Sequence, residues 1–262
     1  NQVDLREALL DSVKAHFIAD VPVGIFLSAG LDSASIAGLS AECQGAGLQS
    51  ITLGFNEFKG QASDEVPLAE QVARLYQMEH QTCRISSDDF DEIYEDLLDV
   101  MDQPSIDGVN TYFVARAAAQ KGLKVALSGL GGDELFGGYN TFSQVPDIVS
   151  KVKGMPISSA FGKAFRVVTA PWVSHFISPK AAGVLELGGS YGGAYLLRRG
   201  LYMPWELERV MDADMARVGF RELDPILRLN HLTSCVDEPR RKVALLELTQ
   251  YMRNQLLRDA DW

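Results

Sequence analysis

The sequence predicts an α/β protein: a mostly parallel, twisted sheet with helices on both faces, followed by a mainly helical region. Three observations support this fold class. Short apolar runs alternate with segments whose apolar residues recur at helical spacing, which is typical of parallel sheets with right-handed crossovers. Two of these apolar runs lead directly into loops of small residues. After about Tyr139 the alternation stops and helical patterns dominate.

The first elements can be read in order from these patterns. Residues 4–17 predict a helix because Leu5, Leu9, Val13 and Phe17 recur at helical spacing. Residues 23–27 form a short apolar run typical of a strand that is covered on both faces. Apolar residues at helical spacing predict the next helix over about 33–44, and the run over 49–55 predicts a second buried strand.

The rest of the first half continues the alternation. After a polar loop over 56–64, Asp64 is expected to cap a helix over about 65–76. A short strand is expected over about 80–85, then a helix over 88–101 capped by Ser86 or Ser87. Proline and glycine predict a loop over 103–108. An amphipathic helix over 111–121 is expected to end at Gly122, just before a strand over 124–127.

The second half is predicted to be a helical cap on this sheet. Helical patterns occupy residues 205–217 and 242–257, and the glycine-rich segment 188–193 predicts a loop. We therefore divide the chain into an α/β region, 1–142, and a mainly helical region, 143–262.

Composition excludes several classes of function. The net charge of −11 argues against nucleic acid or an anionic membrane as the main partner. It also means that a ligand such as ATP must bring its own cation. No run of 18 apolar residues is present, so we expect no membrane span. The three cysteines are far apart in the sequence, which favours a reduced, cytoplasmic protein.

The first small-residue loop is Ser28-Ala29-Gly30-Leu31-Asp32-Ser33, between a predicted strand and a predicted helix. Such a turn directs backbone N–H groups and a helix N-terminus towards one point, which suits a phosphate. No lysine follows the glycine, so this is not the lysine-containing loop of P-loop enzymes. Asp32 would repel a phosphate, and we expect it to hold a Mg²⁺ ion that attracts one. By itself, however, an aspartate here is more often a helix N-cap, and the two serines would be ordinary turn residues.

The second loop follows the strand over 124–127 and contains Ser128, Gly129, Asp133 and Glu134. In an open parallel sheet, loops after neighbouring strands face one crevice, so Asp32 and Asp133 are expected to share one Mg²⁺. Glu134 has two readings, one as a catalytic carboxylate and one as a structural residue near the helix start. The following Gly137 and Gly138 predict a tight turn with positive φ.

With both loops in place, the chain resembles the synthetase domain of glutamine-hydrolysing asparagine synthetases, within the PP-loop ATP pyrophosphatase family. The matching segments are Ser28–Ser33, with alanine for the usual first glycine, and Leu127–Tyr139. Weaker matches are Leu53-Gly54-Phe55, Asp64-Glu65 and Leu256-Leu257-Arg258-Asp259. The resemblance extends along essentially the whole chain and implies a Rossmann-like PP-loop fold.

The resemblance also implies a reaction. ATP would adenylate the side-chain carboxylate of aspartate with release of pyrophosphate, and ammonia derived from glutamine would then displace AMP to give asparagine. It assigns catalytic roles to Asp32, Asp133 and Glu134, and Mg²⁺ to Asp32 and Asp133. ATP would be bound by Leu27, Ser28, Gly30, Asp32, Ser33, Leu53, Gly54, Ser128 and Gly129. The partners implied are these small molecules and a glutaminase domain of the same polypeptide, with neither nucleic acid nor membrane. We also allow for a homodimer.

Three departures from the family pattern leave alternatives open. Leu130 stands where asparagine synthetases carry glutamate and β-lactam synthetase carries tyrosine, and a leucine cannot act as acid or base. Asp107 or Glu134 could substitute. We also expect a fragment that lacks the glutaminase domain and ends before the family's catalytic lysine. The alternatives are therefore a β-lactam synthetase-like or other amidotransferase acting on a different carboxylate, and an inactive nucleotide-binding module.

Overall fold

In the computed structural model the chain forms two compact units, Asn1–Leu130 with Gln255–Trp262, and Gly131–Asn254. The structure describes residues 2–103, 105, 107–155, 159–176 and 179–261. The chain passes from the first unit to the second at Leu130 and returns at Gln255. The division after residue 142 stays a prediction about domains.

The first unit contains a four-stranded sheet in the order β3-β2-β1-β4, with every strand pair parallel. Val23 pairs with Val125, and Ser50 pairs with both Ile25 and His80. This arrangement confirms the predicted α/β class and parallel sheet. Its elements are α1 (Gln2–His16), β1 (Val23–Phe26), α2 (Leu31–Gln44), β2 (Gln49–Phe55), η1 (Asn56–Phe58), α3 (Val66–Leu75), β3 (Glu79–Ile85), α4 (Ser87–Val100), α5 (Gly108–Gln120), β4 (Val125–Leu127) and the terminal α14 (Leu257–Asp259).

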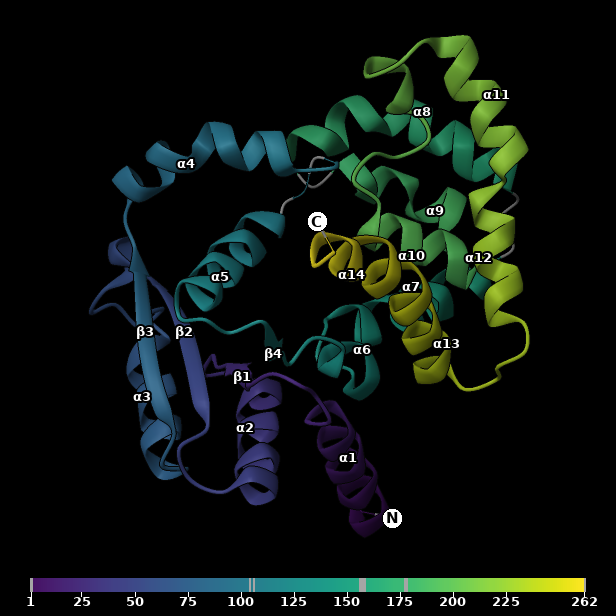
Figure 1. Ribbon diagram of the computed structural model, residues 1–262. Helices are drawn as coiled ribbons and strands as arrows, with labels where there is room; N and C mark the ends of the chain where they lie inside the picture. Colours follow the sequence, from purple (N-terminus) through teal and green to yellow (C-terminus); the bar gives the residue numbers. More distant parts are fainter. Residues whose placement is uncertain (1, 104, 106, 156–158, 177–178, 262) are drawn as a thin grey trace. The chain divides into compact units, whose positions relative to one another are not determined.

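Helices cover both faces of this sheet, as the strand pattern predicts (Figure 1). On one face α2 and α3 pack against Leu27 through alanines 37, 69 and 73. On the other face α5 packs against Ile51 through alanines 117 and 118. Alanines at these positions let the helices approach the sheet closely, and the apolar area removed from water stabilises both layers.

Local signals located the boundaries of this unit to within a few residues. Ser86 is the N-cap of α4, and Asp89 completes a capping box by accepting from the Ser86 N–H. Gly122 adopts φ 76° where α5 ends, as expected of a glycine at this position. Helix α5 begins three residues earlier than predicted, at Gly108. Within the predicted loop 103–108, residues 104 and 106 lie outside the described residues.

The second unit is mainly helical. Its core packs α7, α10, α12 and α13 together around Val145, Tyr195, Leu229 and Val243. The elements are α6 (Gly132–Phe136), α7 (Thr141–Lys153), α8 (Ser159–Phe176), η2 (Pro179–Gly183), α9 (Val184–Leu187), α10 (Tyr191–Arg199), η3 (Leu207–Arg209), α11 (Ala213–Leu223), α12 (Pro225–Thr233), α13 (Pro239–Leu246) and the π-helical η4 (Glu247–Leu256), which crosses into the first unit. Among the described residues, no helix combines the length and the apolar character needed to cross a lipid bilayer.

Two of the elements predicted for this unit are wrong. The glycine-rich segment 188–193 is not a single loop, because α10 begins at Tyr191 and includes Gly192 and Gly193. These glycines serve close packing: a Cβ on Gly193 would lie 2.0 Å from the Leu187 carbonyl oxygen. The helix predicted over 205–217 is replaced by η3 and α11, since Asp212 accepts from the N–H groups of Asp214 and Met215 and starts a new helix there.

Candidate functional site

The strand order places the two small-residue loops side by side. The chain moves outwards from β1 to β3 and then crosses back to add β4 on the other side of β1, so β1 and β4 flank a topological switch point. Ligands of open α/β sheets bind outside the carboxyl ends of the strands at such a point. Ser28 and Ser128 follow the ends of β1 and β4, respectively. Both loops therefore lie at the carboxyl ends of adjacent strands, as the sequence predicts.

The first loop is held in shape by its two serine hydroxyls. The Oγ atoms of Ser28 and Ser33 are 2.8 Å apart, and the Ser33 Oγ also accepts from the Ser28 N–H at 3.2 Å. The Ser33 hydroxyl lies within hydrogen-bond distance of the carbonyl oxygens of Ser28 and Gly30, at 3.0 and 3.1 Å, and donates to one of them at a time. The serines therefore shape the turn that presents the start of α2.

Gly30, and not Asp32, is the N-cap of α2, so the N-cap interpretation of Asp32 is wrong. Gly30 has extended backbone dihedrals, and Asp32 is the second residue of the helix, half-buried in its first turn. A carboxylate here interacts favourably with the positive end of the helix dipole. The N–H groups of the same turn point out of the helix and are suited to an anion.

The second loop contacts this turn directly. A Cβ on Gly129 would lie 2.9 Å from the Ser33 nitrogen and 3.1 Å from the Asp32 Cβ. Only a glycine allows the loop after β4 to approach the start of α2 so closely. The structure thus brings together six of the predicted site residues in the first unit: Ser28, Gly30, Asp32, Ser33, Ser128 and Gly129.

Leu27, Leu53 and Gly54 lie at the same edge, at or near the ends of their strands, and they contribute to packing. Leu27 is 2% exposed; its N–H donates to the Ile51 carbonyl at 2.9 Å, and its carbonyl accepts from the Thr52 hydroxyl. Leu53 packs in the cluster around Phe113. A Cβ on Gly54 would lie 2.5 Å from the Val66 Cγ2.

Sequence reasoning missed Thr52, which holds the Leu27 carbonyl. Its signal was a hydroxyl in the middle of the apolar run Ile51-Thr52-Leu53.

Asp133 and Glu134 lie in α6, in the second unit, between two left-handed glycines, Gly131 (φ 96°) and Gly137 (φ 80°). The prediction of a positive φ is correct for Gly137 and wrong for Gly138. Asp133 is half-buried, whereas Glu134 is fully buried. Because the two predicted Mg²⁺ ligands belong to different units, their pairing stays a prediction. Among the described residues, no three histidine, cysteine or acidic side chains form a group suited to a metal.

Glu134 accepts a hydrogen bond from the Tyr139 hydroxyl at 2.9 Å. Burial, together with this hydrogen bond, raises the pKa of Tyr139 well above its usual range, so the phenol stays protonated and donates. The Glu134 Oε2 is buried and has no hydrogen-bond partner among the described residues. Because its side chain is fully buried, the structure favours a structural role for Glu134 over a catalytic one.

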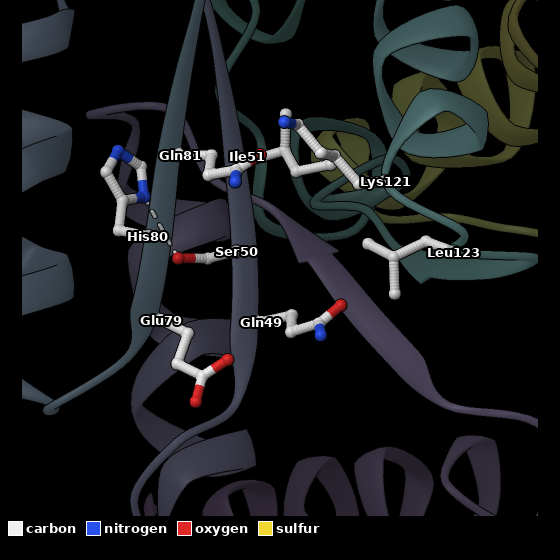
Figure 2. Close-up of a pocket in the computed structure, with 8 residues that line it drawn as sticks. All are labelled: Gln49, Ser50, Ile51, Glu79, His80, Gln81, Lys121 and Leu123. Carbon is white, nitrogen blue, oxygen red and sulfur yellow. Dashed lines mark hydrogen bonds between the residues drawn. The ribbon is translucent and has the colours of Figure 1, made fainter.

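A hollow of about 200 Å³ lies at the opposite edge of the sheet (Figure 2). It is lined by residues 49–51 at the start of β2 and 79–81 at the start of β3, with Lys121 and Leu123. The Ser50 hydroxyl and the His80 Nδ1, 3.0 Å apart, join the two strands there. Because the motif loops follow the carboxyl ends of the strands, this hollow is not part of the candidate site.

A parallel sheet whose switch point is flanked by two such loops defines a Rossmann-like protein of the PP-loop class. The family model described as "Asparagine synthase" matches residues 4–262. The chain belongs to the asparagine synthase family.

Individual relatives share about half of the chain. Asparagine synthetase [glutamine-hydrolyzing] 1 of Bacillus subtilis (strain 168) is 37% identical over 143 residues, which cover 54% of this chain and 22% of that protein. Asparagine synthetase B [glutamine-hydrolyzing] of Escherichia coli (strain K12) is 29% identical over 161 residues, covering 55% and 28%. Amidase chyE of Penicillium rubens is 30% identical over 153 residues, covering 53% and 22%. The matched segments thus make up less than a third of each of these relatives.

Proposed function

We propose that this chain is the synthetase part of an AMP-forming amide ligase that converts aspartate and ammonia to asparagine. ATP activates the side-chain carboxylate as an acyl-adenylate, and ammonia then displaces AMP. Activation is needed because a carboxylate has no adequate leaving group at neutral pH. The observation that carries the proposal is the contact of Gly129 with Ser33 and Asp32, which joins both motif loops at the switch point. Membership of the asparagine synthase family supports it.

The first loop is proposed to receive the pyrophosphate portion of ATP. The N–H groups in the first turn of α2 would meet the charge that develops on the leaving group. The close contact of Gly129 with Ser33 and Asp32 holds the second loop against this turn, so both loops border the same proposed site. Leu27, Leu53, Gly54, Ser128 and Gly129 are proposed to contact the nucleoside. The backbone of Leu27 offers a ligand little further hydrogen bonding, because its N–H and carbonyl are already hydrogen-bonded to Ile51 and Thr52.

Asp32 and Asp133 are proposed to hold Mg²⁺. Two carboxylates fit this ion, which takes oxygen ligands and usually keeps several waters and phosphate oxygens. When bound, Mg²⁺ would neutralise phosphate charge and improve pyrophosphate as a leaving group. Glu134, to which the family resemblance assigns a catalytic role, would act through its hydrogen bond to Tyr139, since its own carboxylate is fully buried.

The ammonia is proposed to come from glutamine. The printed names of the Bacillus and Escherichia relatives include "glutamine-hydrolyzing". We therefore propose a glutaminase domain in the same polypeptide as the partner of this chain, and a cytoplasmic location. A homodimer is the assembly we would test.

The test is release of pyrophosphate and AMP by the polypeptide that contains this chain, supplied with Mg·ATP, ammonium and aspartate. We expect release to require aspartate and to be lost in Asp32→Ala and Asp133→Ala. Asp214→Ala is the matched control, because Asp214 is an exposed carboxylate on α11. ADP and phosphate as products, or full release in both site variants, would contradict the proposal.

A second candidate keeps the ATP site and changes the acceptor. Leu130, beside Gly129, is 42% exposed and cannot transfer a proton, so a different carboxylate substrate fits this position. The amidase from Penicillium rubens shows that relatives with other names match as much of the chain. Competing aspartate with other carboxylates in the pyrophosphate assay separates the two candidates. Binding of Mg·ATP without release for any acceptor would instead indicate an inactive nucleotide-binding module.

A further inference from the structure

The turn after α6 closes back onto Asp133. The main-chain carbonyl of Asp133 accepts from the N–H groups of both Gly137 and Gly138, at 2.9 and 3.0 Å. The turn and the first residues of α6 are therefore linked through this one aspartate. A change in the path of the turn would therefore alter the position of Asp133.

Gly138 leaves the space that the Asp133 carboxylate occupies. A Cβ on Gly138 would lie 1.7 Å from the Asp133 Oδ1 and 2.7 Å from its Cγ. Gly138 does not have a left-handed backbone, so conformational freedom does not explain a glycine here. Gly137, in contrast, has φ 80°. The two adjacent glycines thus have different roles, a left-handed turn at Gly137 and room for a carboxylate at Gly138.

The turn is held from two sides. The Arg240 guanidinium donates to the Phe136 carbonyl and covers Gly137, whose Cβ would lie 2.7 Å from the Arg240 Nη2. On the other side, the Tyr139 hydroxyl donates to the fully buried Glu134. The guanidinium of Arg199 lies over the Tyr139 ring, 4.4 Å from its centre. With the backbone held in this way, a side chain at position 138 would displace the carboxylate and leave the turn in place.

We propose that Gly138 is a positioning residue for the Asp133 carboxylate, and that its missing side chain selects the orientation in which Asp133 binds the Mg²⁺ of Mg·ATP. This inference rests on the proposed function, which makes Asp133 a metal ligand. It adds a reason for the second glycine of the pair. Neighbours that orient metal ligands typically change metal affinity by about 10- to 100-fold when they are substituted.

The test is binding of α,β-methylene-ATP, a non-cleavable analogue, measured by calorimetry over a range of Mg²⁺ concentrations. In Gly138→Ala we expect about tenfold more Mg²⁺ to be needed for half-maximal binding. We expect an unchanged midpoint of thermal unfolding, because the closest atoms, Oδ1 and Cγ of Asp133, belong to a carboxylate that can rotate away while the backbone stays in place. Gly219→Ala on α11 is the matched control, since a Cβ there meets nothing within 4 Å.

Asp133→Asn and the double variant complete the test. If Gly138 acts through Asp133, the double variant needs no more Mg²⁺ than Asp133→Asn alone. Wild-type Mg²⁺ dependence in Asp133→Asn would overturn the metal role itself and this inference with it. A defect in Asp133→Asn with none in Gly138→Ala would overturn the positioning role alone. A lowered unfolding midpoint in Gly138→Ala, or losses that add in the double variant, would show a general structural effect and also overturn it.

Discussion

The contact between the two motif loops can be tested by adding one methyl group, in Gly129→Ala. The new Cβ would lie 2.9 Å from the Ser33 nitrogen, 3.1 Å from the Asp32 Cβ and 3.3 Å from the Asp32 carbonyl carbon. Ordinary contact begins at about 3.4 Å, so the loop and the start of α2 must separate by about 0.5 Å. Two of these atoms belong to the backbone of α2, where the Ala34 N–H already bonds the Gly30 carbonyl at 3.0 Å. They cannot rotate away as a side chain would.

We expect this strain to weaken both stability and nucleotide binding. Overpacking of this kind costs about 1–3 kcal/mol of unfolding free energy. A site that depends on oriented backbone groups tolerates displacements of only about 0.5 Å. If the first turn of α2 binds the phosphates, Mg·ATP should bind about tenfold more weakly, equivalent to about 1.4 kcal/mol.

The assay is calorimetric titration with Mg·ATP, combined with urea unfolding of the ligand-free protein. Gly219→Ala is again the control, and it should gain about 0.5–1 kcal/mol because alanine suits a helix interior better than glycine and an added Cβ meets nothing within 4 Å. Wild-type affinity together with wild-type stability in Gly129→Ala would refute the close approach of the two loops.

Three further predictions concern stability. Thr52→Val should lose about 1–2 kcal/mol in urea unfolding because the Leu27 carbonyl loses its side-chain donor, whereas Thr52→Ser keeps the hydroxyl; equal stability of the two variants would refute this role. Burial lowers the pKa of His80, so the folded state favours the neutral imidazole. The contribution of His80 to the unfolding free energy should therefore be complete above about pH 6.5 and should be lost as the pH falls below that value. His80→Gln should reduce the difference in unfolding free energy between about pH 7.5 and about pH 5. Glu247→Gln should lower the unfolding free energy by about 3 kcal/mol because it removes the buried, charged partner of Arg199. In the double variant with Arg199→Met, the loss should be smaller than the sum of the two single losses. Urea unfolding of all three variants measures this difference.

The strands were predicted well because their signals are local. Each apolar run ends in a polar or glycine-bearing loop, and the observed bounds differ from the predicted ones by at most one residue, as with β1 ending at Phe26 in place of Leu27. The capping signal at Ser86 and the terminating glycine at 122 act through bonds and dihedrals within a few residues. For the same reason, the small-residue loops around Ser28 and Ser128 could be identified as candidate site loops.

Two of the errors occur where residues distant in the sequence decide the outcome. By propensity, residues 188–193 are predicted to form a loop. In the structure Gly192 and Gly193 lie in a helix, and they are glycines because close neighbours leave no room for side chains. Gly138 was expected to supply a positive φ, and it instead leaves room for the carboxylate of Asp133. Composition does not distinguish a glycine that is needed for its dihedral angles from one that is needed for space.

By itself, the sequence determined the α/β class, the parallel sheet and the identity of the two loops that end β1 and β4. Periodicity and small-residue turns depend on residues that are close in the sequence, so they can be recognised from the sequence alone. Only the tertiary structure decided that β4 lies beside β1, because strand order arises from pairing between residues as distant as Val23 and Val125. That pairing presses Gly129 against Asp32 and Ser33, which no local pattern could show.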